Sequence, residues 1–119
     1  MKISKNEIEI IIVYLIENDY LDESRFAKVF TGGKFIIKKW GKIRIVRELK
    51  YRKISDYNIK LALKEISNVD YLKVFNIISS KKIESLKKLN TQEKKRKLIT
   101  FLTYKGWEKE MIYEKLNSF

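Results

Sequence analysis

The feature that most constrains the fold is an apolar pattern that occurs twice, over residues 44–63 and 97–116, with corresponding positions 53 residues apart. The corresponding pairs are Ile45 and Leu98, Leu49 and Leu102, Ile54 and Trp107, Ile59 and Ile112, and Leu63 and Leu116. Tyr51 corresponds in the same way to Tyr104. The paired apolar positions have helical spacing, so the pattern predicts a repeated core. A repeat of this size is typical of arrays of small helical units that stack on one another.

A third copy of the pattern is incomplete and lies near the N-terminus. Its members, each about 51 positions before its counterpart, are Ser4, Ile8, Ile12 and Leu15, which correspond to Ser55, Ile59, Leu63 and Ile66. The sequence therefore predicts an all-α, elongated array of tandem three-helix repeats, one partial and two complete. Residues 1–20 would be the remnant of the first repeat, without its first two helices, and residues 21–67 and 68–119 the second and third repeats.

Capping residues and glycines predict where the helices begin and end. The predicted starts are at or just after Ser4, Asp22, Gly41, Ser55, Asp70 and Asn90. Gly32 and Gly33 predict a kink or frayed turn in the helix that follows Asp22. Gly106 predicts a left-handed helix stop, with Trp107 as its hydrophobic partner.

The composition excludes several kinds of active site. The chain has no cysteine and no histidine, which removes thiol nucleophiles, disulfides, Cys/His zinc sites and Ser-His devices. No acid is paired with a second acid or base in a catalytic setting, so we expect no enzyme, no cofactor and no small-molecule substrate. The apolar run from Ile10 to Ile16 is too short to span a membrane, and no signal-peptide cleavage site follows it. We therefore expect a cytoplasmic protein without membrane contact.

The net charge of +12 is unevenly distributed along the chain. Residues 1–24 carry more acids than bases, whereas residues 25–53 carry eleven Lys and Arg against Glu48 alone. A dense basic segment in a folded domain indicates a polyanionic partner. The alternative is a lysine-rich composition with solvated helix faces, which accounts better for the C-terminal charges than for the middle segment.

The basic segment contains a candidate binding ridge on the helix predicted from Lys42 to Arg52. At 100° per residue, Arg44, Arg47 and Tyr51 fall opposite the apolar arc, with Lys50 at its edge. Three lysines come just before or at the start of this helix: Lys38, Lys39 and Lys42. Arginine binds phosphate or carboxylate, and a neighbouring aromatic ring can stack on a base. The alternative is a solvated face, partly neutralised by ion pairs of Glu48.

Three further groups of residues are weaker candidates. One is a basic run at a predicted helix start, formed by Lys94, Lys95 and Arg96 with Lys97. Positive charge there opposes the helix dipole, which indicates an anionic partner. Trp40 and Trp107 lie at inter-helix turns and are expected to plug helix junctions. Three acids, Asp19, Asp22 and Glu23, could suggest a metal, but helix capping explains two of them and we expect no metal.

The motifs resemble those of the RecX family of regulatory proteins. The resemblance lies in Leu21–Ala27 (Leu-Asp-Glu-Ser-Arg-Phe-Ala), in Trp40–Leu49 (Trp-Gly-Lys-Ile-Arg-Ile-Val-Arg-Glu-Leu) and in a closing unit of Arg96–Leu102 with Gly106, Trp107 and Ile112. It implies tandem three-helix repeats. Two departures are Lys53, where many relatives have glycine, and Gly32-Gly33, which stands in a helix that is usually continuous.

The resemblance also implies a function in recombination, DNA repair and the SOS response. RecX proteins modulate, and usually inhibit, the RecA recombinase by lodging in the groove of the RecA–DNA filament, and direct DNA binding is attributed to them. It implies that Arg25, Arg44, Arg47 and Lys50 contact single- or double-stranded DNA or an acidic RecA surface. The alternative is a general nucleic-acid-binding helical module that needs no protein partner.

Overall fold

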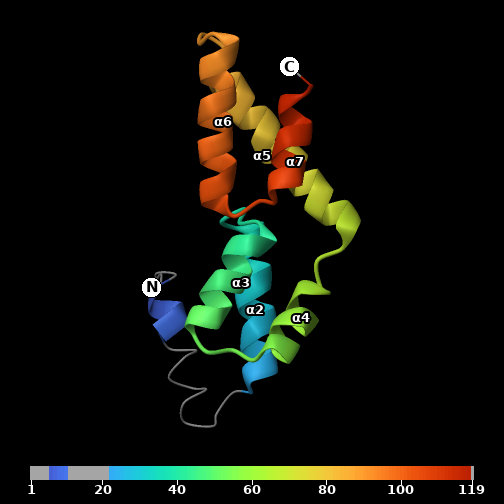
Figure 1. Ribbon diagram of the computed structural model, residues 1–119. Coiled ribbons are helices and arrows are strands. Elements are labelled where there is room, and N and C mark those ends of the chain that lie inside the picture. Colours follow the sequence, from blue (N-terminus) through green and yellow to red (C-terminus); the bar gives the residue numbers. More distant parts are fainter. Residues whose placement is uncertain (1–5, 11–21, 119) are drawn as a thin grey trace.

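The computed structural model describes residues 6–10 and 22–118, and this part of the chain is helical without strands. Figure 1 shows an elongated arrangement, with overall extents of 53 × 34 × 22 Å. A short helical segment covers residues 6–10. The helices that follow are α2 (Glu23–Ile36), α3 (Lys42–Tyr51), α4 (Asp56–Leu63), α5 (Asn68–Ser85), α6 (Thr91–Lys105) and α7 (Lys109–Leu116). The predicted all-α architecture is therefore confirmed.

The helices form two groups of three along the long axis. Helices α2, α3 and α4 contact one another in one half, and α6 contacts both α5 and α7 in the other. In Figure 1, α6 ends where α3 begins, so that these two helices follow each other along one side of the molecule. The two groups lie within the predicted units 21–67 and 68–119, whose boundaries stay a prediction.

Polar side chains start most of the helices where the sequence predicts. The Asp22 carboxylate accepts a hydrogen bond from the Arg25 backbone N–H (2.7 Å), and Asn90 does the same for Glu93 (2.9 Å). The predicted start of α5 at Asp70 is wrong. Ser67 caps this helix by accepting from the Asp70 N–H (3.1 Å), and Asp70 lies in the first turn, where its charge favours the helix dipole. The predicted start after Ser4 lies outside the described residues.

The predicted fraying at Gly32 and Gly33 is also wrong, because α2 continues through both glycines to Ile36. Tertiary packing overrides the poor helix propensity of glycine here. Phe26 and Phe30 before the glycines, and Phe35 after them, are all buried.

An aromatic core joins the two groups of helices. The Trp107 ring centre lies 4.5 Å from that of Tyr71 and 5.3 Å from that of Phe75, and Phe35 of α2 stacks on Tyr71 at 5.9 Å. The Trp107 indole N–H donates to the Lys39 carbonyl oxygen across the junction (3.1 Å). Trp40 and Trp107 are both buried, which confirms that they plug helix junctions.

Gly106 ends α6 in the left-handed conformation, with φ of 93°, as predicted. The chain turns there against the start of α3. The Gly41 N–H donates to the Lys105 carbonyl oxygen (2.8 Å) and the Ile43 N–H donates to that of Gly106 (3.0 Å). These backbone contacts fix α6 and α3 end to end, which positions the candidate site.

Candidate nucleic-acid interface

Helix α3 presents a basic outer face because its apolar residues face the core. Ile45 and Leu49 are fully buried, whereas Arg47, Lys50 and Tyr51 are exposed. Tyr51 is 81% exposed on this outer face. The structure thus exposes these three residues as the periodicity predicts, and their role in binding stays a prediction.

Arg44 departs from the predicted exposed ridge. It is half-buried, and its guanidinium carbon lies 4.2 Å from the Trp40 ring centre and 4.6 Å from the Tyr104 ring centre. Its Nη1 also donates to the Tyr104 carbonyl oxygen (3.1 Å). The expectation that Arg44 stands free beside Arg47 is therefore wrong, since two rings and a carbonyl already engage the guanidinium.

The lysines at the elbow are engaged to different degrees. The Lys42 ammonium lies 4.6 Å from the Tyr71 ring centre, and the Lys39 ammonium donates to the Ile36 carbonyl oxygen. Lys38 is exposed, and its carbonyl oxygen accepts from the Lys105 ammonium (2.9 Å). Of the three predicted elbow cations, Lys38 is the most accessible one.

Two residues at the end of α6 belong to this site but were missed by sequence reasoning. Tyr104 is 66% exposed and contacts Arg44. Lys105 lies beside Arg44 and Lys38, and its pKa is lowered by burial and then by these two positive neighbours. One signal for this site was present in the sequence, the correspondence of Tyr51 with Tyr104 in the repeat. This signal did not indicate that the end of α6 lies against the start of α3.

The remaining predicted cations are spread over the molecule. Arg25, which is exposed, lies in the first turn of α2, and Lys94, Lys95 and Arg96 lie in the first turns of α6. Helix α2 starts at the lower end of Figure 1 and α6 at the upper end. The structure therefore places Arg25 far from the Lys94–Arg96 run, and the predicted residues do not form a single compact site.

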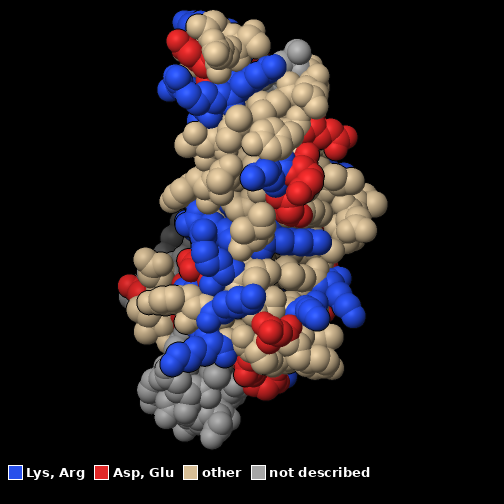
Figure 2. All heavy atoms as spheres, in the orientation of Figure 1, with Lys and Arg blue, Asp and Glu red and all other residues tan. Residues whose placement is uncertain are grey.

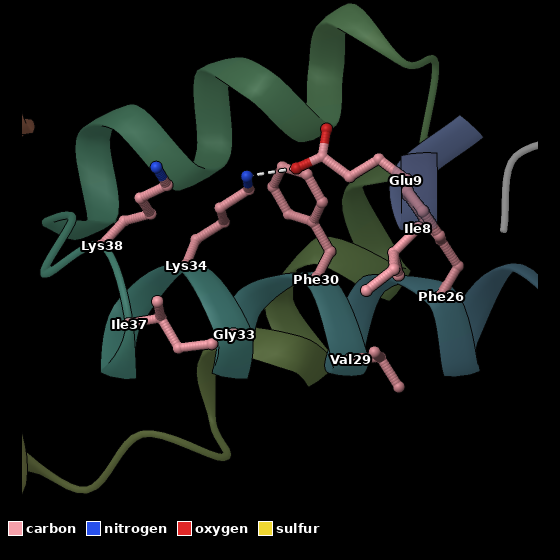
Figure 3. A pocket seen from close by; sticks show the side chains of 9 residues that line it. All are labelled: Ile8, Glu9, Phe26, Val29, Phe30, Gly33, Lys34, Ile37 and Lys38. Carbon is pink, nitrogen blue, oxygen red and sulfur yellow. Dashed lines mark ion pairs between the residues drawn. The ribbon is translucent and has the colours of Figure 1, made fainter. Parts of the chain in front are cut away.

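Acidic residues neutralise part of the basic segment. The Glu9 carboxylate forms ion pairs with Lys34 and with Arg52 (3.0 Å to Arg52 Nη2), and Arg52 also lies 4.0 Å from Glu48. Figure 3 shows the Lys34–Glu9 pair at the edge of a mostly apolar pocket of about 140 Å³, lined by Ile8, Phe26, Val29, Phe30 and Ile37 among others.

The acidic cluster near Asp22 has structural roles. Asp22 caps α2, and the Glu23 carboxylate accepts from the Ser55 backbone N–H at the start of α4. The third acid of the cluster, Asp19, lies outside the described residues. Within residues 6–10 and 22–118, no group of three or more acids is arranged to hold a metal ion.

Figure 2 shows Lys and Arg side chains over α3 and again over the far end of α6, on the face turned to the viewer. Within the described chain, no helix has both the length and the hydropathy to cross a membrane. The fold and this face define a helical-repeat protein with an extended basic surface, the class expected to bind a polyanion.

Comparisons with known proteins narrow this class to one family. Residues 22–63 match the family described as RecX, second three-helix domain. The chain is 32% identical to regulatory protein RecX of Clostridium acetobutylicum over 113 residues, covering 92% of this chain and 52% of the relative. It is 28% identical to the RecX of Vibrio campbellii (89% and 66%) and 24% identical to that of Leuconostoc mesenteroides (89% and 40%). Residues 22–63 thus match a RecX three-helix domain, and most of the chain is similar to regulatory proteins RecX.

The chain spans 40% of the length of the Leuconostoc mesenteroides relative and 66% of the length of the Vibrio campbellii relative. No solved structure matches the chain.

Proposed function

We propose that this protein binds a RecA–DNA filament and inhibits the ATPase and strand exchange of RecA during recombination and DNA repair. Two observations support the proposal. Relatives over most of the chain are regulatory proteins RecX, and the motifs resemble those of a family that modulates RecA. The structural observation on which the proposal depends is the contact of Arg44 with Tyr104, which brings α6 and α3 together into one basic face.

The shape of this face suits a long polymeric partner. The molecule is 53 Å long, which corresponds to about 15 base pairs of B-form DNA. Cations lie at intervals along α6 and α3, and they include the exposed Arg96, Lys97, Arg47 and Lys50. A partner that runs along the molecule would meet phosphates or acidic side chains of successive subunits, whereas a small ligand would use only a fraction of this face.

The test is the ATPase activity of RecA on single-stranded DNA with this protein added at a small fraction of the RecA concentration. Inhibition at substoichiometric amounts is expected, because one molecule seated in a filament affects many protomers. Absence of inhibition until the DNA itself is coated would overturn the proposal.

Two pairs of charge-matched variants show whether the basic face is responsible. Arg47→Ala with Lys50→Ala removes two exposed cations of α3 and should raise the concentration needed for half inhibition about tenfold or more. Lys60→Ala with Lys109→Ala removes two exposed cations of α4 and α7 and should change it less than twofold. Equal effects of the two pairs would contradict a role for this particular face.

The alternative function is a nucleic-acid-binding module that needs no protein partner, and the exposed Tyr51 favours it. Such a protein would lose DNA affinity steeply as salt rises. It would affect RecA only by competing for the strand, so half inhibition would shift in proportion to the DNA concentration rather than to the RecA concentration.

A further inference from the structure

The two halves of the molecule carry the same pairing of a basic residue with a tyrosine. On α3, the basic Arg44 is followed seven residues later by Tyr51, and on α6 the basic Lys97 is followed seven residues later by Tyr104. Seven residues are nearly two helical turns, so each pair lies on one face of its helix, about 10 Å apart along the axis. The sequence repeat thus preserves a stripe of basic and aromatic residues as well as a core.

Arg44 joins these two stripes into one. Its guanidinium stacks between the rings of Trp40 and Tyr104, so the tyrosine that ends the α6 stripe lies against the cation that begins the α3 stripe. Because α6 continues into α3 (Figure 1), the order along the molecule is Lys97, Tyr104, Arg44 and Tyr51. Cations and aromatic rings therefore alternate.

The environment of Tyr104 holds its ring in place while leaving much of it accessible. Arg44 covers one face of the ring, and buried Trp40 supports Arg44 from behind, yet Tyr104 remains 66% exposed. Tyr51, its counterpart, is 81% exposed. A ring fixed on one face and open on the other loses little entropy when a planar ligand stacks on it.

We infer that Tyr104 and Tyr51 stack unpaired bases of single-stranded DNA, while Lys97, Arg47 and Lys50 contact its phosphates. Alternating aromatic rings and cations are the pattern by which proteins bind single strands without reading sequence. Bases paired inside a duplex expose only their edges, so the two rings would distinguish a single strand from a duplex. The inference deepens the proposed function and rests on it in taking the α3–α6 face as the binding surface.

The experiment measures fluorescence anisotropy of a labelled 20-nucleotide dT oligomer and of a labelled 20-base-pair duplex, without RecA. Tyr51→Ala and Tyr104→Ala should each weaken binding to the single strand about tenfold, and the double variant more. Binding to the duplex should change less than twofold. The salt dependence of binding should stay as in the wild type, because no phosphate contact is removed.

Two kinds of control isolate stacking from other effects. Tyr51→Phe with Tyr104→Phe keeps both rings and should bind the single strand within twofold of the wild type. Tyr57→Ala with Tyr113→Ala removes exposed tyrosines of α4 and α7 (71% and 50% exposed) and should also have little effect. Since Tyr104→Ala could loosen the Arg44 contact, the single variant Tyr51→Ala is the decisive one.

The outcomes separate this inference from the proposed function. Wild-type affinity of Tyr51→Ala for the dT oligomer, or equal losses on single strand and duplex, would overturn the stacking inference even if RecA is inhibited. Selective loss on the single strand without any effect of the wild type on RecA would support stacking and contradict the proposed function.

Discussion

The guanidinium carbon of Arg44 lies 4.6 Å from the ring centre of Tyr104, and these two residues are 60 positions apart in the chain. With the backbone hydrogen bonds from Gly41 to Lys105 and from Ile43 to Gly106, this contact fixes the end of α6 on the start of α3. The basic face is therefore built by tertiary structure: each helix alone would carry only half of it.

Arg44 and Arg47 are expected to have separable roles. Arg44→Ala removes a desolvated cation between two rings and should lower the free energy of unfolding by about 2 kcal/mol. Arg47→Ala, at an exposed position, should change it by no more than about 0.5 kcal/mol but should reduce the salt dependence of DNA binding. Urea denaturation and binding titrations at several salt concentrations measure both. Equal loss of stability in the two variants would show that the Arg44 stack contributes nothing.

Alanine substitutions of the glycines are expected to change the stability of the protein in opposite directions. A Cβ on Gly106 would lie 2.3 Å from that of Arg44 at a φ of 93°, and a Cβ on Gly41 would lie 2.3 Å from the Gly106 carbonyl oxygen. Either substitution to alanine should therefore cost several kcal/mol (on the order of 3). Gly32→Ala, with no atom within 4 Å of the new Cβ, should instead stabilise α2 by about 0.5–1 kcal/mol. Thermal melts of the three variants provide the comparison.

A Gly41→Ala variant as stable as the wild type would show that the two halves can separate without cost. Loss of stability in Gly32→Ala would show that α2 needs a flexible point at its centre.

Local features of the sequence predicted much of the fold. Side chains that cap helices act within three residues of themselves, so Asp22, Ser55 and Asn90 could be recognised from the sequence. The error at Asp70 arose because Ser67, three positions earlier, offered an equally good cap. The error at Gly32 and Gly33 arose because burial of Phe35 depends on helices far away in the chain.

The candidate site was predictable only where it depends on one helix. The outward position of Arg47 and Tyr51 follows from the period of α3. The engagement of Arg44 by Tyr104, and of Arg52 by Glu9, joins residues that are 60 and 43 positions apart. Periodicity does not report such pairs, because it orients a side chain relative to its own helix and not relative to a neighbour.

Two buried hydroxyls offer a further test of the core. Thr31 and Ser79 are fully buried, and neither hydroxyl has a hydrogen-bond partner among the described residues. Removing a buried polar group without a partner avoids a desolvation penalty, so Thr31→Val and Ser79→Ala should each be neutral or stabilising by about 1 kcal/mol. Urea denaturation measures the change. Destabilisation by more than about 1 kcal/mol would reveal a hydrogen bond made in solution.

Tyr71 makes the junction between the two groups of helices sensitive to alkaline pH. Its hydroxyl accepts from the Lys42 backbone N–H (2.8 Å) and donates to the Glu108 carboxylate. Burial, followed by the bond to Glu108, raises the pKa of Tyr71 well above its ordinary value of 10.0. Below about pH 9 the phenol is protonated in both states, so this shift leaves stability unchanged.

Above pH 10 the unfolded chain loses the Tyr71 proton while the folded chain retains it, so stability should fall by up to about 1.4 kcal/mol per pH unit. Tyr71→Phe should be less stable than the wild type at pH 7 by about 1–3 kcal/mol, because two hydrogen bonds are lost. The difference should then shrink as the pH rises from 9 to 11, since the variant has no proton to lose. Lys105, whose lowered pKa acts in the opposite direction, is present in both proteins and cancels in the comparison. Urea denaturation at intervals over this range measures the difference, and a constant difference would show that the Tyr71 phenol ionises in the folded protein as it does in the unfolded chain.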